Sequence, residues 1–289
     1  MLTRDTLRKT SGALALAVGL TALAAASAAN AVTSISSSGY GLGVDLTVLG
    51  FLPVTLEPLA SASGSSPPGP YNSTNSVLLL NTSLGLAPVG SLQTGTATLT
   101  GSASSPFTPT PTGTASGTVN NLSGLTLLSL LGTELGVSAT TISSTSSVSG
   151  SGALSAFGST TIEDLVINGT AVGSTITVGG AGAVNPGIDD VIFNSGGLEI
   201  ELNRQTPSGN GITSDGITTD ALYIDFSNFA LGTGLLNGDI ILGQSQANIV
   251  GPAQALPEPG AWALMLVGFA GLGGALRARR RLASMRVAT

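Results

Sequence analysis

The chain has 289 residues, of which 42% are hydrophobic and only 8% charged, and it contains no histidine, no cysteine and a single lysine, Lys9. The lack of histidine and cysteine excludes a Ser-His-acid triad, a cysteine nucleophile, imidazole or thiolate metal sites and disulfides. Because Lys9 is the only lysine, no other residue could form a Schiff base through a lysine amine. Between Val32 and Leu256, 13 carboxylates stand against one arginine, Arg204, and this net charge of −12 excludes nucleic-acid binding through phosphate neutralisation.

The first 31 residues have the three parts of a secretory signal peptide. An uncharged, alanine-rich run covers residues 13–26, and Ala29-Asn30-Ala31 forms a small-x-small cleavage site. The basic residues before the run are Arg4, Arg8 and Lys9. We expect export through the secretion machinery and cleavage after Ala31, the alternative being a retained N-terminal anchor.

Residues 32–256 are expected to form one exported all-β domain, an antiparallel β-sandwich or jelly-roll-like body. They are rich in Gly, Ser, Thr and aliphatic residues and poor in charged helix formers, which favours strands joined by turns. A strict alternation predicts a half-buried first strand. Its apolar face should carry Tyr40, Leu42, Val44, Leu46 and Val48.

The middle of the domain is predicted to mix loops and short elements. Loops rich in Ser, Pro and Gly are expected at 61–70 and 101–117, with a buried strand at 77–80 between them. The dense leucines of 122–135 favour a short helix. One strand face should carry Thr94, Thr96, Thr98 and Thr100. Such a threonine face can bind ice or carbohydrate, but a solvated strand face is the simpler interpretation.

The last third of the domain has the most regular pattern. Strands are expected first at 162–167, 174–178 and 190–194, then at 198–203, 221–226 and 238–242. The last three are joined by Gly- and Asn-rich turns, including a polar loop at 207–216, and they suggest a meander that closes a sandwich.

The carboxylates are the remaining candidates for acid–base chemistry. Glu199 and Glu201 lie two residues apart on one strand and should project from the same face, which makes a polysaccharide hydrolase conceivable. Two charges on the solvated side of a strand explain the same spacing more simply. We therefore assign no catalytic residue and treat the hydrolase as an alternative.

Two clusters of oxygen-bearing side chains suggest calcium as a second alternative. Calcium prefers hard oxygen ligands. One cluster is Asp189-Asp190, and the other comprises Asn210 and Asp215 of the polar loop together with Asp220, which follows it. Neither matches an EF-hand or a calcium-binding repeat. We assign no metal site and no cofactor, and a calcium-dependent carbohydrate-binding module stays an alternative.

The C-terminal tail, 257–289, has the features of a membrane anchor. Residues 261–276 carry no charge, and a transmembrane helix is expected over about residues 260–276. Basic residues stay on the cytoplasmic side, so the rest of the chain should lie outside. The basic end, 277–289, contains Arg277, Arg279, Arg280 and Arg281.

The order of motifs in this tail resembles the C-terminal sorting domain of PEP-CTERM proteins, in its PEPxxWA variant. The residues that carry the resemblance are Pro257, Glu258 and Pro259, followed by Trp262 and Ala263, the apolar run and the arginines. The resemblance implies recognition in the inner membrane by an exosortase, which processes the tail near Pro-Glu-Pro. The five motif residues would then be recognition residues of a substrate.

The body is similar to choice-of-anchor family proteins. The similar segments are SSSGYGLGVDLTVLG, PYNSTNSVLLLNTS, DALYIDF and LNGDIILGQSQA. That resemblance implies surface display and assigns no activity. We therefore expect a non-enzymatic structural or adhesive protein that is anchored in the inner membrane and then moved to the cell surface or extracellular matrix. Its expected partners are the exosortase and an exopolysaccharide.

Overall fold

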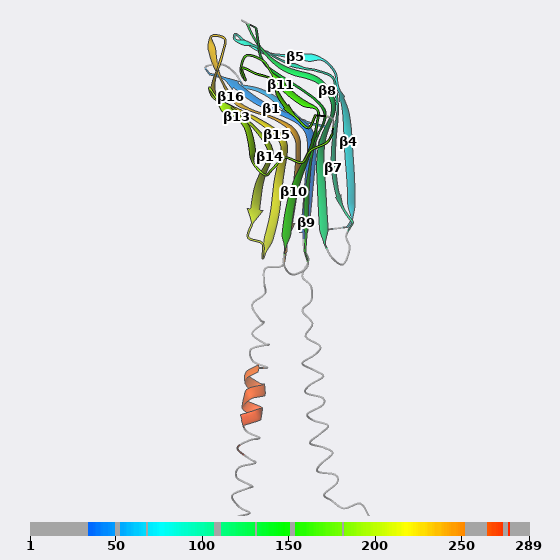
Figure 1. The fold of residues 1–289 in the computed structure, drawn as a ribbon. Helices are drawn as coiled ribbons and strands as arrows, with labels where there is room; N and C mark the ends of the chain where they lie inside the picture. The colour runs from blue at the N-terminus through cyan, green and yellow to red at the C-terminus, as the bar shows by residue number, and fades with distance from the viewer. Residues whose placement is uncertain are drawn as a thin grey trace, which may run out of the picture.

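The computed structural model describes residues 34–49, 53–67, 69–106, 111–130, 132–150, 154–180, 182–251, 265–273 and 277. Within these ranges the body consists of strands in two antiparallel sheets that pack face to face along the long axis of the molecule (Figure 1). The all-β, antiparallel sandwich expected from the sequence is confirmed.

The first sheet has seven strands, and its centre is a meander. Its order is β13 (Asp190–Ser195), β14 (Leu198–Gly209), β15 (Ser214–Leu231), β16 (Gly234–Val250) and β1 (Ser34–Val48). Two short strands, β2 (Pro53–Leu59) and β3 (Ala62–Ser66), follow each other along the free edge of β1. The predicted meander of β14, β15 and β16 is confirmed, and the first strand of the body completes it.

The second sheet has nine strands, built around the long strands β8 (Thr112–Ser129) and β9 (Gly132–Ser149). On the far side of β9 lie β10 (Ser155–Glu163) and β11 (Leu165–Asn168), and β12 (Ile176–Val178) pairs with β11. On the other side of β8 lie β6 (Gly90–Thr94) and β7 (Ala97–Ser105). The outermost strands there are β4 (Tyr71–Leu79) and β5 (Thr82–Leu86).

Both sheets have a crease at which the inward-facing set of side chains shifts by one residue. In the seven-stranded sheet the crease follows one in-register row of inward leucines, Leu42, Leu242, Leu222 and Leu202. In the nine-stranded sheet it passes near Asn121 and Asp164, which have φ angles of 54° and 51°. Asn and Asp tolerate this left-handed conformation better than most residues, so they fit these positions.

The crease divides the interior into two parts of different character. One part holds a large aliphatic core of leucine, valine and isoleucine, with Phe226 its largest fully buried side chain. The other part has a small apolar cluster of Ile35, Val148, Ala247 and Ile249. Close to the crease, small residues fill the space between the sheets, and main chain lies against main chain. A Cβ added at Gly117 of β8 would overlap carbonyl oxygens of β1 and β16.

Several sequence predictions for the first half of the body were wrong. The expected loops at 61–70 and 101–117 contain β3, the end of β7 and the start of β8. The expected helix at 122–135 is instead the end of β8 and the start of β9. Leucine density there reflects burial in strands, because Leu122, Leu125, Leu127 and Leu135 all face the core.

Two further differences concern which face a side chain occupies. Tyr40 lies on the outer face, against Gly43, because the crease lies between it and Leu42. Thr94 is buried in β6 and bonded to Thr82, whereas Thr98 belongs to β7 and is exposed. The predicted single threonine face is therefore split between two strands.

The polar loop predicted at 207–216 is shorter than expected. β14 continues to Gly209 and β15 begins at Ser214, so only residues 210–213 connect them. In the C-terminal tail, residues 265–273 are helical. Among the residues placed by the structure, we find no helix with the length and apolar character needed to span a bilayer. The predicted transmembrane helix extends beyond the described residues at both ends.

Candidate functional site

Most of the predicted sorting residues lie outside the described part of the chain. Of the basic cluster, only Arg277 is described. The residues outside the described ranges are Ala29, Ala31, Pro257, Glu258, Pro259, Trp262, Ala263, Arg279, Arg280 and Arg281. Their proposed roles stay predictions from the sequence.

Glu199 and Glu201 do project from the same outer face of β14, as the alternation predicts. Their surroundings differ. Glu199 accepts a hydrogen bond from the amide of Asn194 on β13. Glu201 is largely buried, and its carboxylate lies 3.9 Å from the Nε of Arg204. A glycosidase requires two carboxylates that face each other across a cleft. Glu199 and Glu201 instead stand side by side along one strand.

Glu199 belongs to a row of carboxylates that crosses four strands. In register, Glu199 of β14 pairs with Asp225 of β15, Asp225 with Asp239 of β16, and Asp239 with Asp45 of β1. Neighbouring strands are about 4.8 Å apart, so adjacent carboxylates repel each other. Burial raises the pKa of Asp239, and the charges of Asp45 and Asp225 raise it further.

Arg204 forms the centre of a second group on the same face, one step further along the strands. Its guanidinium stacks on the Tyr223 ring, with 3.8 Å between Cζ and the ring centroid. One of its NH groups lies 3.9 Å from the Oδ2 of Asp220. The amide of Gln244 donates a hydrogen bond of 2.7 Å to Asp220 Oδ1. The only basic residue of the body is therefore committed to neighbouring side chains.

Burial dominates the titration of this second group. Asp220 has only 4% of its surface exposed, and burial raises the pKa of its carboxyl despite the opposing effects of Gln244 and Arg204. Burial also raises the pKa of Glu201, with a further contribution from the charge of Asp189. Raised carboxyl pKa values of this kind occur in active sites, but they also occur in structural networks.

Three of the predicted calcium ligands, Asp189, Asn210 and Asp215, serve as local hydrogen-bond acceptors. Asp189 accepts from the backbone amide of Gln205, and Asp215 accepts from that of Gly216. The side-chain oxygen of Asn210 accepts from the amides of residues 212, 213 and 214, which fixes the β14–β15 turn. Within the described ranges, no three acidic side chains are grouped closely enough to hold a metal ion. The calcium alternative therefore gains no support.

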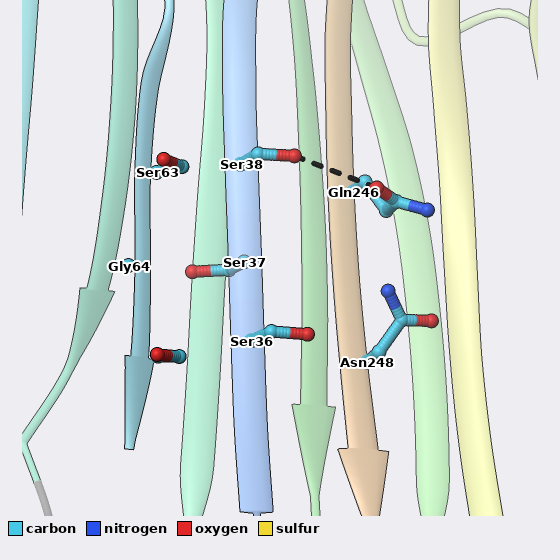
Figure 2. A pocket seen from close by; sticks show the side chains of 8 residues that line it. Ser36, Ser37, Ser38, Ser63, Gly64, Gln246 and Asn248 are labelled. Atoms are coloured by element: carbon cyan, nitrogen blue, oxygen red, sulfur yellow. Dashed lines mark hydrogen bonds between the residues drawn. The ribbon is translucent and has the colours of Figure 1, made fainter. Parts of the chain in front are cut away.

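Two shallow depressions lie on the outer face of the seven-stranded sheet. Figure 2 shows one of about 340 Å³ across β3, β1 and β16, in which Ser38 donates to Gln246 at 3.5 Å. Its lining consists of serines, Gly64, Gln246 and Asn248, with no charge. The other, of about 230 Å³, lies between Tyr40, Asp45, Glu57 and Asp239. Neither is lined by Glu199 or Glu201.

The outer face of the nine-stranded sheet has a different composition, and of its two central rows the sequence analysis singled out only Thr100, as part of the expected threonine face. Five strands bring hydroxyl groups into in-register rows. One row runs across β4, β7, β8, β9 and β10 through Thr74, Ser102, Ser116, Thr145 and Ser159. The next row contains Ser76, Thr100, Thr118, Ser143 and Thr161. We call this surface the hydroxyl face. Its signal in the sequence is Ser or Thr at alternate positions of several segments.

Comparison with protein families, with curated proteins and with solved structures gives no match to this chain.

Proposed function

We propose that the protein is a non-enzymatic, exported body with a structural or adhesive role. On this proposal, it is held in the inner membrane by its C-terminal tail and is then processed by an exosortase for the cell surface or extracellular matrix. The proposal combines the terminal signals of the sequence with the chemistry of the folded body.

The observation that carries the non-enzymatic part is the placement of the charged groups. Nine of the 13 carboxylates of the body lie on strands of the seven-stranded sheet. On its outer face four carboxylates form an in-register row and two lie beside Arg204. The pair considered for catalysis, Glu199 and Glu201, lines neither of the two depressions described on this face. Hydrolysis at a glycosidic bond needs two carboxylates on opposite sides of the substrate.

The decisive experiment compares the cellular location and intact mass of the wild type with those of Glu258→Ala. We expect the wild type to lose its tail near Pro257 and leave the inner membrane, whereas Glu258→Ala stays there at its unprocessed mass. Glu57→Ala is the matched control, because Glu57 is an exposed carboxylate on β2. Equal mass and location for wild type and Glu258→Ala would refute sorting through this motif.

A further inference from the structure

We propose that the hydroxyl face of the nine-stranded sheet binds a neutral polysaccharide along its rows of serine and threonine side chains. This rests on the proposed structural or adhesive function and names its partner by chemical class. Four features of the face support the assignment: its regular spacing, its free hydrogen-bonding capacity, its lack of charge and its exposed aromatic residue.

The spacing of the hydroxyl face is set by the backbone. Rows repeat along each strand every two residues, at about 6.8 Å, and strands repeat at about 4.8 Å. Each row crosses five strands, from β4 to β10, so the repeating surface is much longer than a single sugar. A repeating surface of this length suits an extended polymer with a repeat of its own better than a small ligand.

The hydroxyl groups retain hydrogen-bonding capacity. Several pair across strands, as Ser102 does with Ser116 at 2.8 Å and Thr118 with Ser143 at 2.9 Å. Each hydroxyl has one donor and two acceptor positions, so one such bond leaves capacity for a further partner. The pairing also orients the hydroxyls before a ligand arrives, which lowers the entropy lost on binding.

The charge distribution selects a neutral partner. The two rows contain no ionisable side chain, the adjoining row beyond Thr161 adds one carboxylate, Glu163, and the body as a whole carries a net charge of −12. An acidic polymer is repelled by that net charge, and a basic one is drawn to the carboxylate row on the opposite sheet. A neutral polyhydroxylated polymer experiences neither effect, and its hydroxyls match those of the face.

Phe157 supplies an apolar platform beside these rows. It lies on β10, two residues before Ser159, and 67% of its surface is exposed. It pairs in register with Ser147, which extends the same outer face. Among the described residues of the two sheets, it is the one aromatic side chain in the exposed class. Sugar-binding surfaces commonly combine such a ring with a few polar groups.

The test is cosedimentation of the full chain, in mild detergent, with insoluble neutral polysaccharides: cellulose, β-1,3-glucan and starch granules. Calcium-alginate beads serve as the acidic polymer. We expect depletion by at least one neutral polymer and none by alginate. Thr145→Lys, in the middle of a row, and Phe157→Ala should each weaken binding at least tenfold. Both positions are exposed, so neither change should unfold the protein, and circular dichroism checks this.

Thr206→Lys is the matched control, because Thr206 is an exposed threonine on β14 of the other sheet. It should bind within twofold of the wild type. No depletion by any of the three neutral polymers would overturn the proposal, and so would equal weakening by Thr145→Lys and Thr206→Lys. Failure here with normal processing of the tail leaves sorting intact. Binding combined with unprocessed tail would refute sorting alone.

Discussion

Replacing Gly117 with alanine tests the close approach of the two sheets. In β8, a Cβ at this position would overlap the carbonyl oxygens of Tyr40 and Gln244 and lie 2.7 Å from the amide nitrogen of Gln244. These are main-chain atoms of β1 and β16, which pair with each other here, and β16 also pairs with β15 on its other side. They can only yield if the sheets separate.

The expected cost follows from two opposing effects. Overpacking a well-packed interior by one methyl group costs about 1–3 kcal/mol, and a backbone clash belongs at the upper end. Alanine in a strand recovers about 0.5–1 kcal/mol relative to glycine. We therefore expect Gly117→Ala to lower the free energy of unfolding by about 2 kcal/mol. For a domain of this size that corresponds to a drop of roughly 4–8 °C in Tm.

The assay is thermal and urea unfolding followed by circular dichroism, with Gly124→Ala as the control. Gly124 lies in the same strand, and a Cβ there would meet only the Thr126 hydroxyl, at 3.9 Å. The control should equal or slightly exceed the wild type in stability. A Tm for Gly117→Ala within 1 °C of the wild type would show that the sheets are not fixed at this distance.

Three further predictions concern polar side chains of the two sheets. Ser146 and Ser144 are both fully buried in β9. Ser146→Ala should lower the free energy of unfolding in urea by about 1–3 kcal/mol, because the Ser146 hydroxyl bonds Thr219 and Ser245. Ser144→Ala should lower it by less than about 0.5 kcal/mol, because the Ser144 hydroxyl has no partner among the described residues. Equal losses for the two variants would contradict this. Arg204→Met should lower stability by about 1–2 kcal/mol at pH 7 and by less at low pH, because protonation of Glu201 and Asp220 removes the charges that Arg204 pairs with; a loss independent of pH would count against the network. Burial raises the pKa of Asp220 in the folded protein, so stability should fall as pH rises from about 4 through that raised value. Asp220→Asn should therefore raise Tm more at pH 8 than at pH 4.5. An equal gain in Tm at both pH values would refute this.

The sequence predicted the fold class and the C-terminal meander because those segments follow simple rules. In β14, Leu198, Ile200 and Leu202 alternate with polar residues, and short turns of Gly and Asn leave little choice of connection. The strand-rich composition was equally informative. Neither rule, however, says which distant strand becomes the neighbour of β1, since that depends on the packing of the whole sheet.

The predictions failed where a local pattern had two explanations. The leucines of 122–135 fit a helix or a buried strand equally well, and only pairing of β8 with β9 decides between them. Tyr40 was placed on the wrong face because a crease shifts the alternation, and one strand alone does not reveal a crease. The candidate sites behaved in the same way: Glu199 and Glu201 share a face as expected, but Arg204 and the hydroxyl rows depend on register between strands.

The narrow gap between the sheets near the crease also explains the unusual composition of the chain. At Gly117, Gly101 and Gly39 even a methyl group would collide with the main chain of the opposite sheet. Glycine is therefore essentially the only residue that these three positions accept. The close approach of the two sheets therefore explains part of the high glycine content of the chain, which has 41 glycines. We expect amino-acid substitutions to accumulate on the outer faces and around the large aliphatic core. We expect the fewest substitutions near the crease, where the main chains of the two sheets are in contact.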